Sequence, residues 1–330
     1  MTEVLVLGGT GLLGFHTTNL LLDRGYEVTT LSLPVEDSSF LPEAATARFG
    51  DVTTMTDTDL LALLADKHAV FYAIGADERT VPPAPAARFF YEANVLPTQR
   101  VARLARQSGV QKFVLYGSYT AQWAEEWPDL GYRTRNGYPR TRLMQEEVAC
   151  LEGAGEMDVM TLRLPYIFGN VPNQRPLWQM FLDMVAGQEG PAAVLGGSTS
   201  SVTVRQVAQA AVGAMEHGEH EGRYPINGYD LSYLEFQQMC LAAVGRDPQD
   251  AVVVPLEVML PGYEAAQEQS TAAGVEHGIH LPDSARFQAR DAVSDPAVCA
   301  VLGIEPDDVP AAIRETLTWC VHHPRETTGY

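Results

Sequence analysis

The sequence predicts an α/β fold in which a doubly wound parallel sheet is followed by a smaller, mostly helical C-terminal region. Two observations support this prediction. Short apolar runs alternate with helical stretches through the first half of the chain, as is typical of βαβ units. A glycine-rich turn follows the first apolar run and opens a helix. The length of 330 residues fits one large domain of this kind with a smaller appendage.

The first half of the chain supplies strands and helices in alternation. In chain order these segments are VLVLG, LLGFHTTNLLLDRG, YEVTTLSL, LLALLADK and AVFYAIG. A long helix is expected from about Ala87 to Ser108, followed by the buried strand KFVLYGS. A second long helix is expected from about Tyr138 to Gly153, before the strand DVMTLRLP.

The pattern changes after Gly169, where the spacing loosens. The segments VRQVAQAAVGAMEHG, YLEFQQMCLAAVG and VPAAIRETLTWCVHH predict helices with little strand between them. We therefore expect a sheet domain over residues 1–168 and a smaller region over residues 169–330 that returns in places to the sheet.

Composition and charge narrow the class of protein. Because 22 Lys and Arg residues stand against 42 Asp and Glu residues, the formal charge is −20, which argues against nucleic acid as a partner. The four cysteines are widely scattered, so we expect reduced thiols rather than disulfides or metal ligands. The N-terminal residues lead straight into a strand without an export signal, and no apolar run approaches the roughly 20 residues of a membrane span. These features predict a cytoplasmic protein without a membrane partner.

Three glycines, Gly8, Gly11 and Gly14, form the pattern G-x-x-G-x-x-G between the first strand and the first helix. We expect Gly8 to make the tight turn, Gly11 to admit a close approach of the backbone, and Gly14 to let the helix pack on the strand. Free amides at the start of the helix, aided by the helix dipole, favour a phosphate group. The pattern therefore predicts a Rossmann-type site in which the turn, including Thr10, Leu12 and Leu13, holds the pyrophosphate of a dinucleotide.

This spacing resembles the extended short-chain dehydrogenase/reductase family, whose members are epimerase- and dehydratase-like. The resemblance continues in GDV at 50–52, AIGA at 73–76, ANV at 93–95 and the C-terminal run from DAVSDPAVCAVLGIEP to LTWCV. It implies that further contacts with the cofactor come from Asp51, Val52, Ala73, Ile74, Gly75, Asn94, Pro165 and Ile167. It also implies a substrate-binding role for residues 169–330 and a homodimer formed through the two long helices.

The choice of nicotinamide cofactor depends on the end of the second strand. An acidic residue there would bind the ribose 2′-hydroxyl, whereas an arginine would bind a 2′-phosphate. The position holds Ser32, followed by Leu33. Both NAD and NADP remain open, and the lack of a nearby cation favours NAD.

The resemblance also supplies three catalytic candidates, Ser118, Tyr138 and Arg142. In the family a tyrosine exchanges a proton with the substrate oxygen, a serine polarises that oxygen, and a lysine four residues after the tyrosine supplies a cation. Here Arg142 stands at the lysine position, and the i, i+4 spacing places it on the same helix face as Tyr138. A free tyrosine titrates near pH 10, so a neighbouring cation is needed to favour the phenolate. In the alternative interpretation, Arg142 simply pairs with Glu146 and Tyr138 is an ordinary half-buried phenol.

The neighbouring residues narrow the substrate class. An Asp–Glu pair, which the resemblance associates with sugar dehydratases, does not follow Ser118, and Tyr166 stands where sugar-nucleotide epimerases commonly have an asparagine. The cations available for a substrate diphosphate are only the loose candidates Arg163, Arg175 and Arg205. A smaller carbonyl or alcohol fits better, and Thr120 and Tyr166 are the candidates for contacts with it. A loop cap is the equal alternative for Thr120. Aromatic residues that we expect to wall an apolar pocket are Tyr119, Trp123, Trp127, Tyr132, Tyr166, Phe168 and Trp178.

The leading hypothesis is an NAD(P)-dependent oxidoreductase that transfers hydride to or from a small carbonyl or alcohol. One alternative is a sugar-nucleotide epimerase. Another is an NAD(P)-binding regulatory protein whose chemistry has weakened because arginine replaces lysine at position 142. His217 and His220 lie in a charged turn, and we expect no metal site there.

Overall fold

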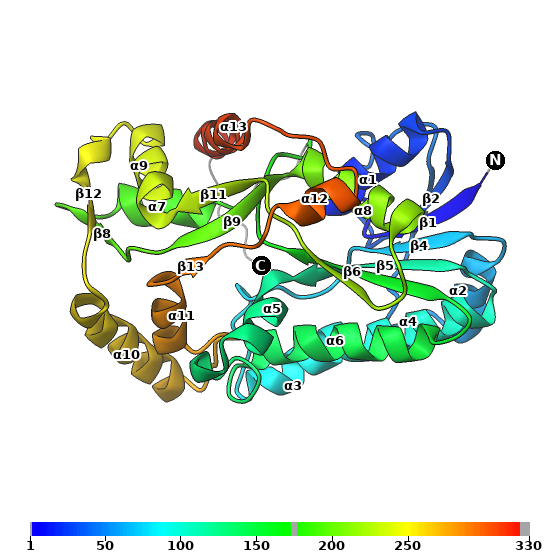
Figure 1. Ribbon diagram of the computed structural model, residues 1–330, viewed down its shortest axis with the longest axis horizontal. Coiled ribbons are helices and arrows are strands. Elements are labelled where there is room, and N and C mark those ends of the chain that lie inside the picture. The colour runs from blue at the N-terminus through cyan, green and yellow to red at the C-terminus, as the bar shows by residue number, and fades with distance from the viewer. Residues whose placement is uncertain (1, 173–176, 324–330) are drawn as a thin grey trace.

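The computed structural model describes residues 2–172 and 177–323, and its centre is a seven-stranded parallel sheet (Figure 1). The strand order is β10-β6-β5-β4-β1-β2-β3. The strands are β1 (Glu3–Leu7), β2 (Glu27–Ser32), β3 (Thr46–Phe49), β4 (Ala69–Tyr72), β5 (Lys112–Ser118), β6 (Asp158–Leu164) and β10 (Gly222–Pro225). The order reverses between β1 and β4, which confirms the predicted doubly wound sheet and places a crevice at the carboxyl ends of these strands.

Helices cover both faces of this sheet. On one face lie α1 (Leu12–Asp23) and α8 (Val204–His217), and on the other lie α2 (Asp57–Leu64), α4 (Leu96–Gln107) and α6 (Gly137–Gly153). Alternate residues of β1 enter the two cores: Val4 and Val6 join the first, whereas Leu5 and Leu7 join the second. Residues 4–7 of the strand are thus all apolar because both of its faces are buried there.

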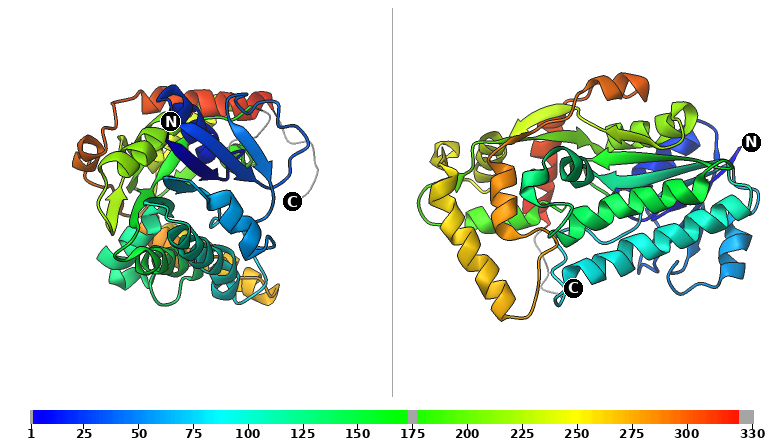
Figure 2. Two further views of the ribbon diagram at one scale, coloured as in Figure 1. Left: turned by 90° about the vertical axis from the view of Figure 1, so that its right-hand side faces the viewer. Right: turned by 60° about the horizontal axis from the view of Figure 1, so that its bottom comes forward.

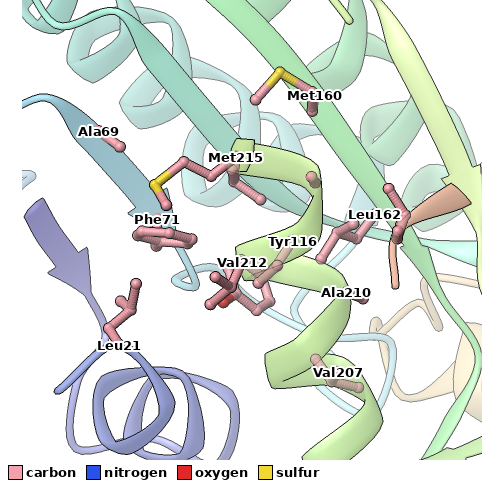
Figure 3. Packing of buried hydrophobic residues seen from close by; sticks show 14 of the residues in the cluster. Leu21, Ala69, Phe71, Tyr116, Met160, Leu162, Val207, Ala210, Val212 and Met215 are labelled. Atoms are coloured by element: carbon pink, nitrogen blue, oxygen red, sulfur yellow. The ribbon is translucent and has the colours of Figure 1, made fainter. Parts of the chain in front are cut away.

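The core on the α8 face illustrates this packing (Figure 3). Phe71, Tyr116 and Leu162 come from three neighbouring strands, and they belong to one buried cluster with Val212 and Met215 of α8. Helix α8 follows residue 169 in the sequence, as β10 does, yet both complete the first domain. The two regions on either side of residues 168 and 169 therefore share one sheet, because β10 comes from the second region and pairs with β6 of the first.

The first long helix that the sequence predicts consists of three joined parts. These are α3 (Ala86–Phe90), the π-helical turn η1 (Tyr91–Val95) and α4. A π-helical turn inside an α-helix often marks a functional position, and this one carries the buried Asn94. The helix runs beside α6 along the same face of the molecule (Figures 1 and 2).

The remainder of the chain, from residue 166 onwards, combines helices with short strands that the sequence did not reveal. Its strands are β7 (Tyr166–Phe168), β8 (Ala192–Val194), β9 (Ser198–Thr203), β11 (Tyr229–Ser232), β12 (Ala251–Val253) and β13 (Asp291–Ala292). Its helices are α7 (Gln179–Ala186), α9 (Tyr233–Ala243), α10 (Leu256–Ala272), α11 (Leu281–Gln288), α12 (Ala297–Val301) and α13 (Val309–His322). Within the described ranges, none of the helices combines the length and the apolar character that crossing a membrane requires.

Candidate active site

The glycine-rich turn lies between β1 and α1, at the point where the strand order reverses. Gly8 has a φ of +92°, and a Cβ atom there would lie 2.5 Å from the carbonyl oxygen of Ala73. A Cβ atom on Gly14 would lie 2.1 Å from the carbonyl oxygen of Gly8. Both positions therefore require glycine, one for its conformation and both for space. Gly11 is the N-cap of α1, and the first bond of the helix joins the amide of Phe15 to the carbonyl of Gly11 at 2.9 Å.

Ser32 supports this turn from below. It ends β2 and is buried, and its hydroxyl accepts a hydrogen bond of 2.9 Å from the amide of Thr10. The structure gives the Ser32 hydroxyl this internal partner within the turn, and its contact with the cofactor stays a prediction. The exposed Leu33 follows, so neither an acidic nor a basic side chain ends this strand.

Asp51 and Val52 lie in the turn after β3. The carboxylate of Asp51 accepts hydrogen bonds from the amide of Thr53 at 2.8 Å and from its hydroxyl at 2.7 Å. The carbonyl of Val52 accepts a hydrogen bond of 2.8 Å from the guanidinium of Arg100. This turn is thus anchored to α4 and remains at the same edge of the sheet as the glycine-rich turn.

Asn94 holds the loop that follows β4. Its side-chain oxygen accepts a hydrogen bond of 2.8 Å from the amide of Ala76, and its side-chain nitrogen donates one of 3.0 Å to the carbonyl of the same residue. The preceding Gly75 has a φ of +145°, and a Cβ atom there would lie 2.6 Å from the side-chain oxygen of Asn94. Asn94 therefore shapes the wall of the crevice through Ala76.

A cleft of about 640 Å³ opens at the carboxyl ends of β4, β5 and β6. Residues from both sides of the predicted site line this cleft: Leu13, Ala73, Ile74, Gly75, Ser118, Tyr138, Arg142, Pro165, Tyr166 and Ile167. Its outer wall is built by residues of α7 and α11 together with His277 and Ile279. The fold thus brings the three catalytic candidates into one space.

Ser118 and Tyr138 meet within the cleft. Ser118 ends β5 and caps α5 (Tyr119–Glu126), because its hydroxyl accepts a hydrogen bond of 3.2 Å from the amide of Thr120. It also lies 2.9 Å from the hydroxyl of Thr120 and makes a side-chain hydrogen bond with Tyr138. Thr120 is buried behind Ser118 and is not among the residues that line the cleft. The sequence proposed it as a substrate contact, but its hydroxyl is used to position Ser118.

Tyr138 is buried in the first turn of α6. Its ring packs edge-on against Phe90, with 5.3 Å between the ring centroids, and its amide donates a hydrogen bond of 2.8 Å to the carbonyl of Gly278. A Cβ atom on Gly278 would lie 2.8 Å from the Cβ of Tyr138. Burial raises the pKa of the Tyr138 phenol, whereas the positive charge of Arg142 and the hydrogen bond with Ser118 lower it.

Arg142 is buried one helical turn after Tyr138, and its Cζ lies 5.8 Å from the centroid of the tyrosine ring. Its Nη1 donates a hydrogen bond of 2.7 Å to Oε1 of Gln145, and its Nη2 donates one of 2.5 Å to the carbonyl of Tyr116. Gln145 in turn donates a hydrogen bond of 2.7 Å to the hydroxyl of Thr98. All of these hydrogen-bond partners are neutral, and the carboxylates of Asp77 and Glu78, which line the same cleft, act on Arg142 only through their charge.

The alternative in which Arg142 pairs with Glu146 is wrong. Glu146 is fully buried and binds Arg163 at 2.8 Å, and Arg163 also binds Glu125 at 2.6 Å. Burial raises the pKa of the Glu146 carboxyl, while its bonds with Arg163 lower it. This network joins α6 to β6 and α5.

The loose cationic candidates do not form a diphosphate site among the described residues. Arg163 is committed to two carboxylates, and Arg205 binds Asp307 at 2.9 Å on the outside of α8. Arg175 lies outside the described residues. Of the two histidines that the sequence singled out, His220 accepts a hydrogen bond of 3.2 Å from the amide of Val159.

The aromatic residues divide into two groups. Tyr119, Tyr166 and Trp178 line the cleft. Trp123 and Trp127 lie with ring centroids 4.1 Å apart and form a separate buried cluster that also contains Tyr132. Phe168 stacks on Trp178 from behind, with 4.6 Å between centroids. The predicted aromatic wall thus consists of part of the set, and Phe181 of α7 joins it.

Comparison with known proteins identifies the family. The sequence profile of the NAD dependent epimerase/dehydratase family matches residues 4–227. The chain belongs to this family. The match covers the glycine-rich turn, the three catalytic candidates and all but the first residue of the seven-stranded sheet.

Two relatives of this family member are steroid or sterol enzymes. Sterol-4-alpha-carboxylate 3-dehydrogenase, decarboxylating, of Mus musculus is 25% identical over 225 residues, which cover 64% of this chain and 59% of the mouse protein. 3-beta-hydroxysteroid dehydrogenase of Mycolicibacterium neoaurum is 27% identical over 267 residues, which cover 74% of this chain and 70% of that protein. The chain therefore matches less than two thirds of the mouse enzyme's length.

Solved structures share the fold of the family member over nearly its whole length. The crystal structure of gox2253 superposes with a TM-score of 0.77 at 21% identity and covers 98% of this chain and 99% of that chain. A UDP-N-acetylglucosamine 4-epimerase from Methanobrevibacter ruminantium M1, in complex with UDP-N-acetylmuramic acid, has a TM-score of 0.67 at 18% identity and covers 98% and 100% of the two chains. WbmH of Bordetella bronchiseptica, in complex with NAD+, has a TM-score of 0.66 at 18% identity and covers 99% of each chain.

The residues present fit the nicotinamide dinucleotide on which the family depends. The glycine-rich turn has no room for a Cβ atom at Gly8 or Gly14, so its backbone is left uncovered by side chains there. The amides that precede the first intrahelical hydrogen bond of α1 have no partner within the helix and can donate to a phosphate. At the other end of the crevice, the Nε of Arg142 is a buried donor that has no acceptor among the described residues. Both ends therefore offer donors to phosphate or hydroxyl oxygens.

Sequence reasoning missed two residues that shape this site. Gln145 is the hydrogen-bond acceptor of Arg142, and its position three residues later on α6 was a usable signal. The carbonyl of Gly278 accepts a hydrogen bond from the amide of Tyr138. No local sequence pattern links a position in the C-terminal region to the start of α6.

Proposed function

We propose that this family member is an NAD(P)-dependent oxidoreductase that interconverts an alcohol and a carbonyl on an apolar molecule. The observation that carries the proposal is the convergence of Ser118, Tyr138 and Arg142 in one cleft beside Ala73–Gly75. The steroid and sterol dehydrogenases among the relatives support an alcohol or carbonyl as the reacting group.

In the proposed reaction, the hydroxyls of Ser118 and Tyr138 bind the substrate oxygen from the β5 side of the cleft. Tyr138 donates its proton to that oxygen during reduction and accepts it during oxidation. The nicotinamide, when bound, supplies or accepts the hydride. Because burial raises the pKa of Tyr138, the phenol is protonated at neutral pH, which favours the direction of carbonyl reduction.

Arg142 acts as the cation in this scheme. Its charge lowers the pKa of Tyr138, and we propose that its unpartnered Nε donates to a hydroxyl of the nicotinamide ribose. Gln145 and the carbonyl of Tyr116 fix the plane of the guanidinium. A planar, directional cation is thereby given one orientation.

NAD is the proposed cofactor in preference to NADP. The residues that follow β2 are Leu33–Asp37, which include no cation and end with two carboxylates. Carboxylates at this place repel a 2′-phosphate.

We also propose that the protein forms a homodimer through the helices α4 and α6, which lie side by side on one face of the molecule (Figure 2).

The direct test follows the absorbance of reduced nicotinamide while a panel of ketones and alcohols is offered with NAD(H) and with NADP(H). We expect turnover by the wild type and its loss in Tyr138→Phe, which preserves the ring packing on Phe90. Tight cofactor binding without turnover on the panel would contradict the proposal. Tightly held NAD that is never consumed in net terms, together with epimerisation of a sugar nucleotide, would favour the epimerase alternative.

A nicotinamide-binding regulator is distinguished by Arg142→Lys. A gain of turnover in this variant indicates an enzyme that arginine has weakened. Cofactor binding without turnover in either form favours a binding protein.

A further inference from the structure

Helix α7 carries two apolar faces, although a helix packed on a single core needs only one. The face directed at the core consists of Trp178, Leu182 and Val185. Beside it lies a second apolar set, which consists of Leu177 just before the helix, Met180, Met184 and Phe181, and of these Phe181 also packs against the core. The spacing within the second set is i, i+3, i+4 and i+7, so its members form one stripe along the helix.

This stripe begins inside the cleft and leaves it. Leu177, Met180 and Phe181 line the cleft, and Leu177 and Met180 are 44% and 39% exposed. Met184, one turn beyond Met180, is 64% exposed and lies outside the lining. On the loop after β4, Val81 also lines the cleft and is 38% exposed. Apolar side chains thus mark the rim of the cleft from two sides and continue outwards along α7.

Polar groups do not interrupt the stripe. The polar residues of α7, Gln179 and Asp183, occupy the remaining side of the helix and bind each other at 2.8 Å. Methionine side chains adapt to ligands of different shape, so two of them at the end of such a stripe suit a variable apolar contact. A cleft of about 640 Å³ is in the usual size range of ligand sites, and it must accept both the reacting group and the nicotinamide.

We propose that the substrate carries an apolar portion too large for the cleft, and that this portion extends over Met180 and Met184 of α7. The inference rests on the proposed function, because it assigns the reacting oxygen to Ser118 and Tyr138. The continuity of the stripe with the cleft favours the substrate over a protein partner as its occupant. The substrate class is therefore an alcohol or ketone on an extended apolar skeleton or chain.

The test uses straight-chain methyl ketones of about four to about ten carbons with the wild-type protein and reduced cofactor. Each methylene that becomes buried is expected to raise kcat/KM by up to about fourfold, and the rise should continue for ketones that reach past Met180. A plateau that begins with the shortest ketones would overturn the inference while leaving the proposed function intact.

Met180→Gln and Met184→Gln then locate the contact. In each variant we expect the ratio of kcat/KM between the longest and shortest ketones to fall by tenfold or more, and in Met184→Gln only the longer ketones should be affected. Val301→Gln is the matched control, because Val301 is 58% exposed and does not line the cleft. An equal fall for long and short ketones would contradict a contact with the apolar portion.

Calorimetric binding of the same ketones to the cofactor complex separates the two proposals. Affinity that rises with chain length in the absence of turnover supports the apolar contact and contradicts the proposed function. Sedimentation of the wild type and of Met184→Gln addresses the other possible occupant. A dimer that this substitution converts to a monomer would show that a second copy covers the stripe, and would overturn the inference.

Discussion

Replacing Arg142 with glutamine removes the positive charge beside Tyr138 while keeping a polar side chain of moderate length. The guanidinium carbon lies 5.8 Å from the centroid of the tyrosine ring. At about this separation, and with an effective dielectric constant of about 20, a unit charge stabilises the phenolate by about 3 kcal/mol. This corresponds to about two pKa units. The pKa of Tyr138, which burial already raises, should therefore rise further by about two units in Arg142→Gln.

The expected consequence depends on the direction of reaction. Alcohol oxidation needs the phenolate, so at a fixed pH below the pKa its rate should fall about 100-fold, in line with about two pKa units. Its pH–rate profile should move to higher pH by the same amount. Carbonyl reduction starts from the neutral phenol and should lose less. The assay is kcat for both directions as a function of pH, at cofactor concentrations that saturate each protein.

Arg142→Lys is the control, because it retains the charge and loses the bidentate bonds to Gln145 and Tyr116. We expect its pH profile to stay close to that of the wild type. An equal fall in the rates of oxidation and reduction in Arg142→Gln would refute the electrostatic reasoning. Urea denaturation of each variant separates a loss of charge from a loss of folding, since Arg142 is buried.

Three further predictions concern the turn and the buried network. Gly14→Ala should abolish detectable dinucleotide binding in a calorimetric titration, because its Cβ would lie 2.1 Å from the carbonyl of Gly8, whereas Gly262→Ala, which meets nothing within 4 Å, should bind normally. Ser32→Ala should weaken cofactor binding by roughly fivefold to tenfold, since the amide of Thr10 loses its acceptor; unchanged affinity would show that the bond does not hold the turn. Glu146→Ala should lower the free energy of unfolding by about 1.5–3 kcal/mol, because the buried Arg163 loses its hydrogen bonds with Glu146 and keeps its ion pair with Glu125. The exposed pair of Arg88 and Glu92 is the comparison, and Glu92→Ala should cost no more than about 1 kcal/mol.

The sheet and its helices could be predicted because their signals are local. The alternation of apolar strands with helical stretches follows from burial of each strand on both faces, as β1 shows. Strand β9 gave no such signal, because its sequence STSSVT is polar. Its serines are buried through hydrogen bonds instead: Ser201 donates to the carbonyl of Tyr229 at 2.9 Å, and Ser200 accepts from the amide of Ser294 at 2.8 Å. Those partners lie far along the chain, so periodicity could not reveal this strand.

The candidate site divides in the same way. The identity and order of Ser118, Tyr138 and Arg142 follow from motif and helical spacing, and the topology brings them to one edge of the sheet. The direction of each side chain depended on contacts between distant segments. Ser32 was predicted to contact the cofactor, and the structure adds that its hydroxyl accepts a hydrogen bond from the amide of Thr10. The i, i+4 spacing alone suggested Glu146 as a partner of Arg142, but Glu146 forms an ion pair with Arg163 of the neighbouring strand β6 instead.

The same contacts explain why arginine at position 142 is more than an imperfect lysine. The guanidinium has donors in three directions, and two of them bind Gln145 and the carbonyl of Tyr116. The third, Nε, is buried and has no acceptor within the described residues. A lysine carries its charge on one nitrogen at the end of a flexible side chain. It therefore cannot bind both acceptors in the fixed orientation that they give to the planar guanidinium. Gln145 therefore belongs with Arg142, because a carboxylate in its place would neutralise the cation and an apolar residue would release it. The neutral acceptor fixes the orientation of the guanidinium without forming an ion pair with it, and we propose that this pairing makes arginine compatible with the acid–base step assigned to Tyr138.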